Sequence, residues 1–114
     1  MTIERLKPGA WNSKAVVTGE TIYMSGIVAD DKTVGIKEQT EQVLRKIDTI
    51  LKAAGSDKTK ILSSVVYLAN MSEKDLMNEA WMAWMDPKHP PARAAVGVVL
   101  TPSTLVEIMC VATK

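Results

Sequence analysis

The sequence predicts an α+β fold in which two helices cover one face of a five-stranded sheet. The predicted elements follow in the order β-β-α-β-α-β-β, and each helix lies between two strands, a pattern typical of a split βαβ sheet with both helices on one side. The composition, 46% apolar and 24% charged over 114 residues, is typical of a globular protein. At this length, residues 1–114 are expected to form a single domain.

The first half of the chain predicts a hairpin followed by a long helix. Residues 15–18 and 21–25 are β-prone and are separated by Gly19-Glu20, a turn signal, and residues 27–29 extend the second strand. Residues 36–54 then carry apolar side chains at three- and four-residue steps, which predicts an amphipathic helix. Gly55 stands where a glycine commonly ends a helix.

The second half predicts a strand, a helix and two more strands. Residues 60–69 are rich in β-branched side chains. Ser72 opens a helix, with Asp75 at the spacing of a capping box, and Pro87 ends it. Residues 92–100 and 105–113 are the last two predicted strands.

The strand predicted at 92–100 is apolar on both of its faces, which indicates that both faces are buried. Two helices, each about 10 Å across, can cover only one face of a five-stranded sheet. We therefore expect a second copy of the chain to cover the other face in a homo-oligomer, because an exposed apolar sheet face promotes aggregation.

Charge and composition exclude several classes of function. The net charge is +1 with no basic run, which argues against nucleic-acid binding and against an anionic membrane surface. Cys110 is the only cysteine, so no internal disulfide can form, and together with His89 it cannot make a Cys/His zinc site. No apolar run has the roughly 18 residues of a membrane-spanning helix, and the first ten residues do not resemble a signal peptide. We expect a cytoplasmic protein that binds no metal.

Two charged residues interrupt apolar strands and are the leading candidates for chemistry. Arg93 either forms an ion pair or reaches solvent at the strand end, or it anchors a carboxylate ligand through two hydrogen bonds. Glu107 either pairs with Arg93, deters aggregation at an edge strand, or acts as a general base.

Other residues are weaker candidates. Ser25-Gly26 is either a turn or a place where backbone approaches a ligand, and Asn78 either faces solvent or bonds to a loop. Trp11 is either a pocket wall or an interface aromatic residue. Trp81 and Trp84 are expected in the core, and Cys110 is expected to be a buried hydrophobe.

Several short motifs in order resemble the RidA (YjgF-type) family of reactive-intermediate deaminases. The resemblance covers nearly the whole chain and is carried by these segments: Tyr23-Met24-Ser25-Gly26, Gln39 within a helix ending Ala53-Ala54-Gly55, Val65-Val66-Tyr67-Leu68, Asp75-Leu76-Met77-Asn78, Pro91-Ala92-Arg93-Ala94-Ala95-Val96 and Leu105-Val106-Glu107-Ile108. It implies a chorismate-mutase-like fold and a homotrimer whose sheets face inward, with ligand clefts between subunits.

The resemblance also implies an activity, which is the hydrolysis of small 2-imino or 2-enamino acids, such as 2-aminoacrylate, to 2-keto acids and ammonia without a cofactor. By matching motifs, Arg93 looks like the carboxylate clamp and Glu107 like the group that positions water. Gly26, Ser25 and Asn78 match residues that line the cleft.

The chain departs from the family pattern at Ala95, where active members often have Cys or Thr, at Ile27, and at Trp11, which falls near a pocket tyrosine. These departures favour an alternative, a trimer that binds or senses a small carboxylate such as a keto acid without catalysis. A remote alternative is a ribonuclease or translation inhibitor, against which the near-neutral charge argues.

Overall fold

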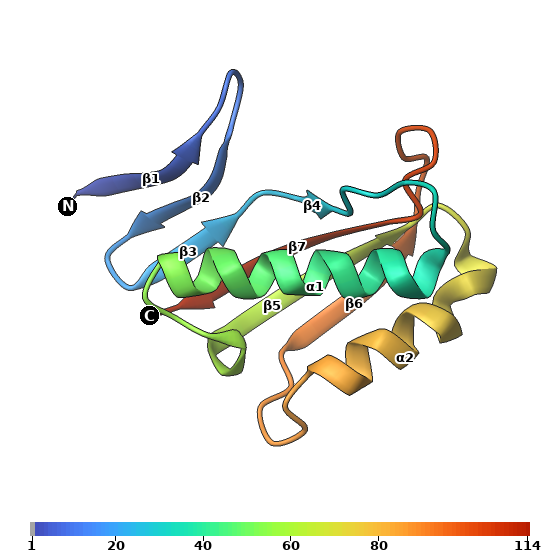
Figure 1. Ribbon diagram of the computed structural model, residues 1–114. Helices are drawn as coiled ribbons and strands as arrows, with labels where there is room; N and C mark the ends of the chain where they lie inside the picture. The colour runs from blue at the N-terminus through green and yellow to red at the C-terminus, as the bar shows by residue number, and fades with distance from the viewer. Residues whose placement is uncertain (1) are drawn as a thin grey trace.

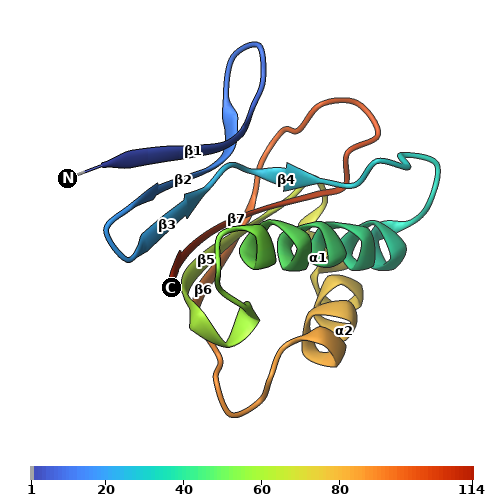
Figure 2. The same ribbon diagram turned by 60° about the vertical axis from the view of Figure 1, so that its left-hand side comes forward.

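The computed structural model describes residues 2–114 and consists of one mixed sheet with two helices on the same side of it (Figures 1 and 2). Its strands and α-helices are, in chain order, β1 (Ile3–Pro8), β2 (Ser13–Thr18), β3 (Thr21–Met24), β4 (Ile27–Val28), α1 (Ile36–Ala53), β5 (Ile61–Leu68), α2 (Lys74–Trp84), β6 (Ala92–Gly97) and β7 (Val106–Thr113). The predicted α+β class, with both helices on one face, is confirmed.

The order of strands across the sheet is β1-β2-β3-β7-β5-β6, with β4 paired to β7 beyond the end of β3. All neighbouring strands are antiparallel except β5 and β6, which are parallel and are joined through α2. The last strand of the chain therefore lies in the middle of the sheet, and β6 forms one of its edges (Figure 1).

Helix α1 forms as its apolar pattern predicts. Its buried face lies over the sheet and includes Val43, Leu44 and Ile47. The helix ends at Ala53, and two residues later Gly55 has a φ of +79°, while the amide of Ser56 donates to the Leu51 carbonyl at 2.9 Å. This is the glycine-terminated helix end that the sequence predicts.

Helix α2 begins differently from the prediction. Met71–Glu73 form a short 3-10 turn, and the helix proper starts at Lys74 with no side chain capping its first turn. Asn70 instead accepts a hydrogen bond from the Ser72 amide at 3.1 Å. The capping box predicted for Ser72 and Asp75 is therefore wrong, because the side chain of Asn70 performs that role one turn earlier.

Two strand predictions are corrected by the structure. Strand β1 was not expected, because its side chains are almost all exposed and give no apolar alternation, and it pairs only with β2. Strand β6 ends at Gly97 rather than at residue 100. Its partner β5 ends at Leu68, so the chain beyond Gly97 has no strand to pair with.

The two faces of the sheet have different environments. On β7 the even-numbered residues are buried beneath the helices, whereas Glu107, Met109 and Val111 lie on the other side, which we call the open face. Tyr23, Val96 and Met109 are exposed hydrophobic side chains on the open face. The expectation that this chain leaves one apolar sheet face uncovered is confirmed, whereas its burial by a second copy stays a prediction.

Candidate functional site

Glu107 lies against Gly26 on the open face. Val28 of β4 pairs with Glu107 of β7, and this pairing brings the turn before β4 alongside the carboxylate. A Cβ atom built on Gly26 would lie 2.1 Å from Glu107 Oε2, so any larger residue at this position requires the carboxylate to move. Glycine leaves room for the Glu107 carboxylate in its observed position.

Ser25 connects this pair to the preceding hairpin. Its amide donates to the Lys14 carbonyl at 3.0 Å, and its hydroxyl donates to the Ser13 carbonyl. The backbone leading into Gly26 is therefore fixed by β2. We refer to Ser25, Gly26 and Glu107 as the carboxylate half-site.

Positive side chains surround the loop that follows β4. Lys32 donates to the Ala29 carbonyl at 2.6 Å, and Lys46 of α1 donates to Asp30 at 2.8 Å. Burial, assisted by the charge of Lys46, lowers the pKa of Lys32, while the charges of Asp30 and Glu107 oppose that change.

Arg93 lies on the other side of the sheet, where the helices pack. Its guanidinium carbon is 5.0 Å from the centroid of the Trp81 ring, and its Nη1 is 3.9 Å from Met77 Sδ. Within residues 2–114 no carboxylate lies within ion-pairing distance of it. Burial lowers the pKa of Arg93, but a guanidinium remains protonated in proteins.

Asn78 and Ala95 belong to the same region as Arg93. Ala95 is two residues further along β6 and shares the helix-covered face. Asn78 follows Met77 on α2 and is partly exposed, but its Oδ1 is buried and has no hydrogen-bond partner within residues 2–114. A buried amide oxygen without a partner can accept a hydrogen bond from a ligand. We refer to Asn78, Arg93 and Ala95 as the guanidinium half-site.

The structure does not bring the two half-sites together within one chain. The sequence suggested that Arg93 and Glu107 lie on adjacent strands. In the structure, strand β5 lies between β6 and β7 and separates them. Tyr67 of β5 pairs with Glu107, whereas Ser64 of β5 pairs with Arg93, and these two β5 residues face opposite sides. The suggested ion pair between Arg93 and Glu107 is therefore wrong for a single chain.

Trp11 belongs to neither half-site in this chain. It lies in the connection between β1 and β2 and is 89% exposed. The structure thus leaves both interpretations of Trp11 untested. The sequence analysis missed one contribution: it predicts Trp81 in the core but does not show that Trp81 and Met77 contact Arg93.

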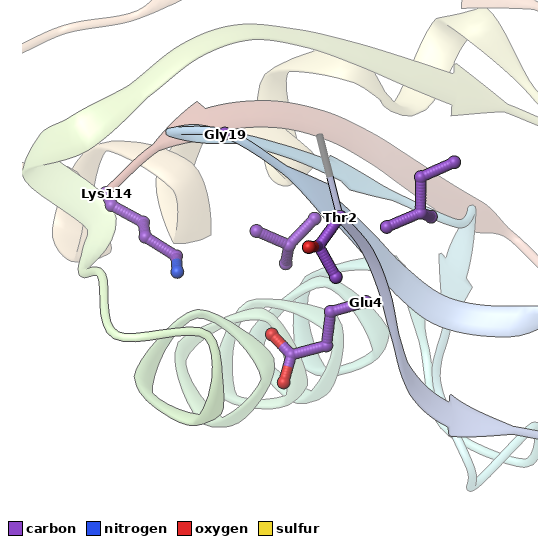
Figure 3. Close-up of a pocket in the computed structure, with 6 residues that line it drawn as sticks. Thr2, Glu4, Gly19 and Lys114 are labelled. Carbon is purple, nitrogen blue, oxygen red and sulfur yellow. The ribbon is translucent and has the colours of Figure 1, made fainter.

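A separate cavity of about 520 Å³ lies beside the N-terminal strand and the end of the chain, and Figure 3 shows its lining. The residues that line it are Thr2, Ile3, Glu4, Val17, Gly19 and Lys114. It contains no residue of either half-site, and its open shape and mixed lining define no chemistry. This cavity is therefore not the candidate site.

Across residues 2–114, no three or more His, Cys, Asp or Glu side chains gather where they could hold a metal ion. No helix within those residues has the length and apolar character needed to cross a membrane.

The fold defines a class of small α+β proteins, and comparison with known proteins identifies it. The family model described as Endoribonuclease L-PSP matches residues 2–114. The chain belongs to this family, the YjgF/RidA type, and has its chorismate-mutase-like fold.

Individual relatives support the same assignment. A RutC family protein from Haemophilus influenzae is 38% identical over 116 residues, covering 99% of each chain. The human 2-iminobutanoate/2-iminopropanoate deaminase is 35% identical over 114 residues, covering 92% of this chain and 82% of the human protein. The crystal structure of a YjgF family member from Neisseria meningitidis superposes with a TM-score of 0.97 at 37% identity, covering 100% of this chain and 96% of that one.

Proposed function

We propose that this protein hydrolyses small 2-imino and 2-enamino acids to 2-keto acids and ammonia, in the cytoplasm and without a cofactor. The active site forms in a cleft between subunits of a homotrimer, where the guanidinium half-site of one copy meets the carboxylate half-site of the next. A human relative that is named as a 2-iminobutanoate/2-iminopropanoate deaminase supports the reaction class.

One observation carries this proposal. Arg93 is a partly buried cation without a carboxylate partner in the described residues, and it faces away from Glu107 of its own chain. A buried cation is costly unless an anion pairs with it. A substrate carboxylate supplies that anion, and the uncovered open face supplies a surface on which a second copy can complete the site.

The residues would divide the work as follows. Arg93 holds the substrate carboxylate through two charge-assisted hydrogen bonds, and Asn78 Oδ1 accepts a hydrogen bond from a ligand N–H group. Glu107 of the neighbouring copy orients a water molecule and accepts its proton as the oxygen attacks C2 of the imine. With the imine protonated at the start, the adduct carries a hydroxyl and an amino group, and the proton passes from Glu107 to the amino nitrogen. The C–N bond then breaks while Glu107 takes the hydroxyl proton, which releases ammonia and leaves the keto acid.

Holding the reactants together supplies much of the rate enhancement. The imine carbon is already electrophilic, so fixing the water and the carboxylate in one geometry is enough to accelerate hydrolysis. This explains how a site without a metal ion or cofactor would be sufficient for the reaction.

The test is a coupled assay with mixed oligomers. 2-Aminoacrylate and longer imines are generated in situ by an amino-acid dehydratase or oxidase, and imine loss is followed with wild type, Arg93→Ala and Glu107→Gln. Both variants should be inactive alone. Co-expressed at equal amounts, they should recover about a quarter of wild-type activity, because that share of interfaces combines two intact halves.

Oligomeric mass from light scattering is measured for every sample, and RNA cleavage is measured alongside because the family description names an endoribonuclease. Undiminished activity in either variant would contradict the assigned roles. Absence of recovery in mixed oligomers of trimer mass would contradict a site shared between copies.

A second candidate function is supported by Ala95. This methyl side chain stands beside Arg93 and adds no polar group to the helix-covered side of β6. A trimer that binds a keto acid and releases no ammonia fits this composition. Saturable binding of 2-oxobutanoate to a wild type that leaves every imine unchanged would establish it in place of the deaminase.

A further inference from the structure

The Arg93 side chain rests on one face of helix α2. Met77 and Trp81 are four residues apart on α2, so their side chains lie one above the other. Both are buried, with exposed fractions of 0% and 4%. Arg93 reaches them from β6, with its guanidinium carbon 5.0 Å from the Trp81 ring centroid and Nη1 3.9 Å from Met77 Sδ.

The Trp81 ring also lies close to a second tryptophan ring on the same helix. The ring of Trp84 lies 5.6 Å away at an angle of 56°. Trp84 Nε1 donates a hydrogen bond to Asp48 Oδ2 of α1 at 2.9 Å, and Lys58 donates to the Trp84 carbonyl at 2.6 Å. The surface beneath Arg93 is therefore tied to both helices and has little freedom to move.

This support leaves most of the guanidinium donors of Arg93 free. A guanidinium carries five N–H donors, and the only protein contact recorded for them within residues 2–114 is the thioether of Met77, a weak acceptor. An aromatic face attracts the cation without accepting its planar hydrogen bonds. Trp81 can therefore fix the position of Arg93 without competing with a carboxylate ligand.

We propose that Trp81 is a positioning residue that holds Arg93 in the geometry required to bind the substrate carboxylate. The inference rests on the proposed function, since it takes Arg93 as the carboxylate clamp. Without the ring, the long arginine side chain samples several rotamers and must be ordered each time a ligand binds. Trp81 increases the affinity in two ways: it orders the Arg93 side chain before the ligand binds, so that less conformational entropy is lost on binding, and it stabilises the partly buried charge.

The experiment measures binding directly, with 2-oxobutanoate as the probe, by isothermal titration calorimetry. This keto acid is a stable product of the proposed reaction, so binding is measured whether or not the protein turns over imines. Trp81→Leu should raise the Kd about 3- to 30-fold, the range of a partly desolvated cation–aromatic contact. Trp81→Phe should restore most of the affinity, because phenylalanine keeps an aromatic face beneath Arg93.

Trp84→Leu is the matched control, because it removes an equally large ring from α2 that has no recorded contact with Arg93. Its Kd should change by less than that of Trp81→Leu, even where the melting temperatures of the two variants fall equally. In the Arg93→Ala background, Trp81→Leu should have no further effect on the Kd. In the imine assay, Trp81→Leu should raise KM while changing kcat little.

The outcomes separate this inference from the proposed function. If wild type binds 2-oxobutanoate and Arg93→Ala does not, but Trp81→Leu binds as wild type does, Trp81 is not a positioning residue and Arg93 keeps its role. Equal losses of affinity in Trp81→Leu and Trp84→Leu would assign the effect to helix stability and overturn the inference. If Trp81→Leu fails to fold, Trp81→Met, which also lacks an aromatic face but adapts more readily to the space left by the ring, replaces it in every comparison. No binding by wild type would instead remove the carboxylate clamp itself.

Discussion

The two half-sites are held in place by different means. Glu107 is fixed by backbone, because β7 pairs with β4 and β5 on either side and Gly26 leaves a gap for the carboxylate. Arg93 lies on edge strand β6 and is fixed by side chains, chiefly the buried Trp81 ring. Substitutions in the carboxylate half-site should therefore change the catalytic step, and substitutions in the guanidinium half-site should change ligand binding.

The largest expected effect comes from separating these two roles. Arg93→Ala should raise the Kd for 2-oxobutanoate about 100-fold or more, because two charge-assisted hydrogen bonds are lost. Glu107→Gln should leave this Kd close to wild type and lower kcat by about 10²- to 10⁴-fold, the usual contribution of a general base. Calorimetry and the coupled imine assay measure the two quantities.

Melting temperature and oligomeric mass should stay near those of wild type for both variants. A Glu107→Gln variant that loses binding as completely as Arg93→Ala would show that the two half-sites do not divide the work.

The next effect concerns Gln39, which supports the strand that carries Glu107. Gln39 is completely buried; its Nε2 donates to the carbonyls of Val34 and Ser103 at 3.1 and 3.0 Å, and its Oε1 accepts from the Leu105 amide at 3.1 Å. Gln39→Leu leaves three backbone groups without partners and should lower the free energy of unfolding by about 3 kcal/mol. Urea denaturation measures the change.

Gln42→Leu provides the matched control, because Gln42 lies on the same helix and its one recorded hydrogen bond, from the Asp31 amide, is exposed. That variant should lose less than about 0.5 kcal/mol. Equal losses in the two variants would show that Gln39 does not anchor β7.

Much of the fold follows from the sequence, because its core elements bury regular apolar patterns. Helix α1 and strands β5 and β7 have such patterns, and the structure places them together at the centre. Strand β1 could not be predicted in this way, since its exposed residues are ordered only by pairing with β2. The start of α2 could not be predicted because Asn70 and Ser72 are both residue types that cap a first turn, and residue spacing alone does not show which of them does so.

For the candidate site, residue type proved more informative than position. An arginine and a glutamate within apolar strands stood out, but their separation depended on β7 inserting between β3 and β5, a long-range event that local pattern does not encode. The closeness of Gly26 and Glu107 depends on the same insertion. Trp81 was correctly expected in the core, yet its contact with Arg93 required knowing which face of β6 lies beneath α2.

A smaller effect should come from filling the gap at Gly26. In Gly26→Ala the new Cβ would lie 2.1 Å from Glu107 Oε2, so the carboxylate must move. Displacing a catalytic group by about 1 Å can cost up to roughly 100-fold in rate, and a flexible glutamate that partly readjusts should lose about 10-fold in kcat. The keto-acid Kd should change less, since Arg93 is untouched.

Gly35→Ala is the control for this substitution, because no atom lies within 4 Å of its added Cβ and its φ of −76° suits alanine. It should match wild type in kcat. If Gly26→Ala does so too, Glu107 does not need its observed position.

The smallest expected effect is a pH-dependent change in stability at the Asp30–Lys46 ion pair, in the loop that follows β4. The hydrogen bond and charge of Lys46 lower the pKa of Asp30 below its ordinary value, so the Asp30 carboxylate binds a proton less tightly in the folded state than in the unfolded state. The ion pair therefore stabilises the fold above about pH 4 and loses that effect as the pH falls through the lowered pKa. Because Asp30 is exposed, the gain is screened and should be about 0.5 kcal/mol or less. Asp30→Asn should melt slightly below wild type at pH 7, and the difference should shrink as the pH is lowered below 4 and in 1 M salt.

The guanidinium half-site, where no carboxylate pairs with Arg93 within residues 2–114, should show no such dependence. Arg93→Met should differ from wild type in melting temperature by the same amount throughout this pH range. A difference between wild type and Asp30→Asn that does not shrink as the pH is lowered below 4 would show that Asp30 stabilises the loop through its shape rather than through its charge.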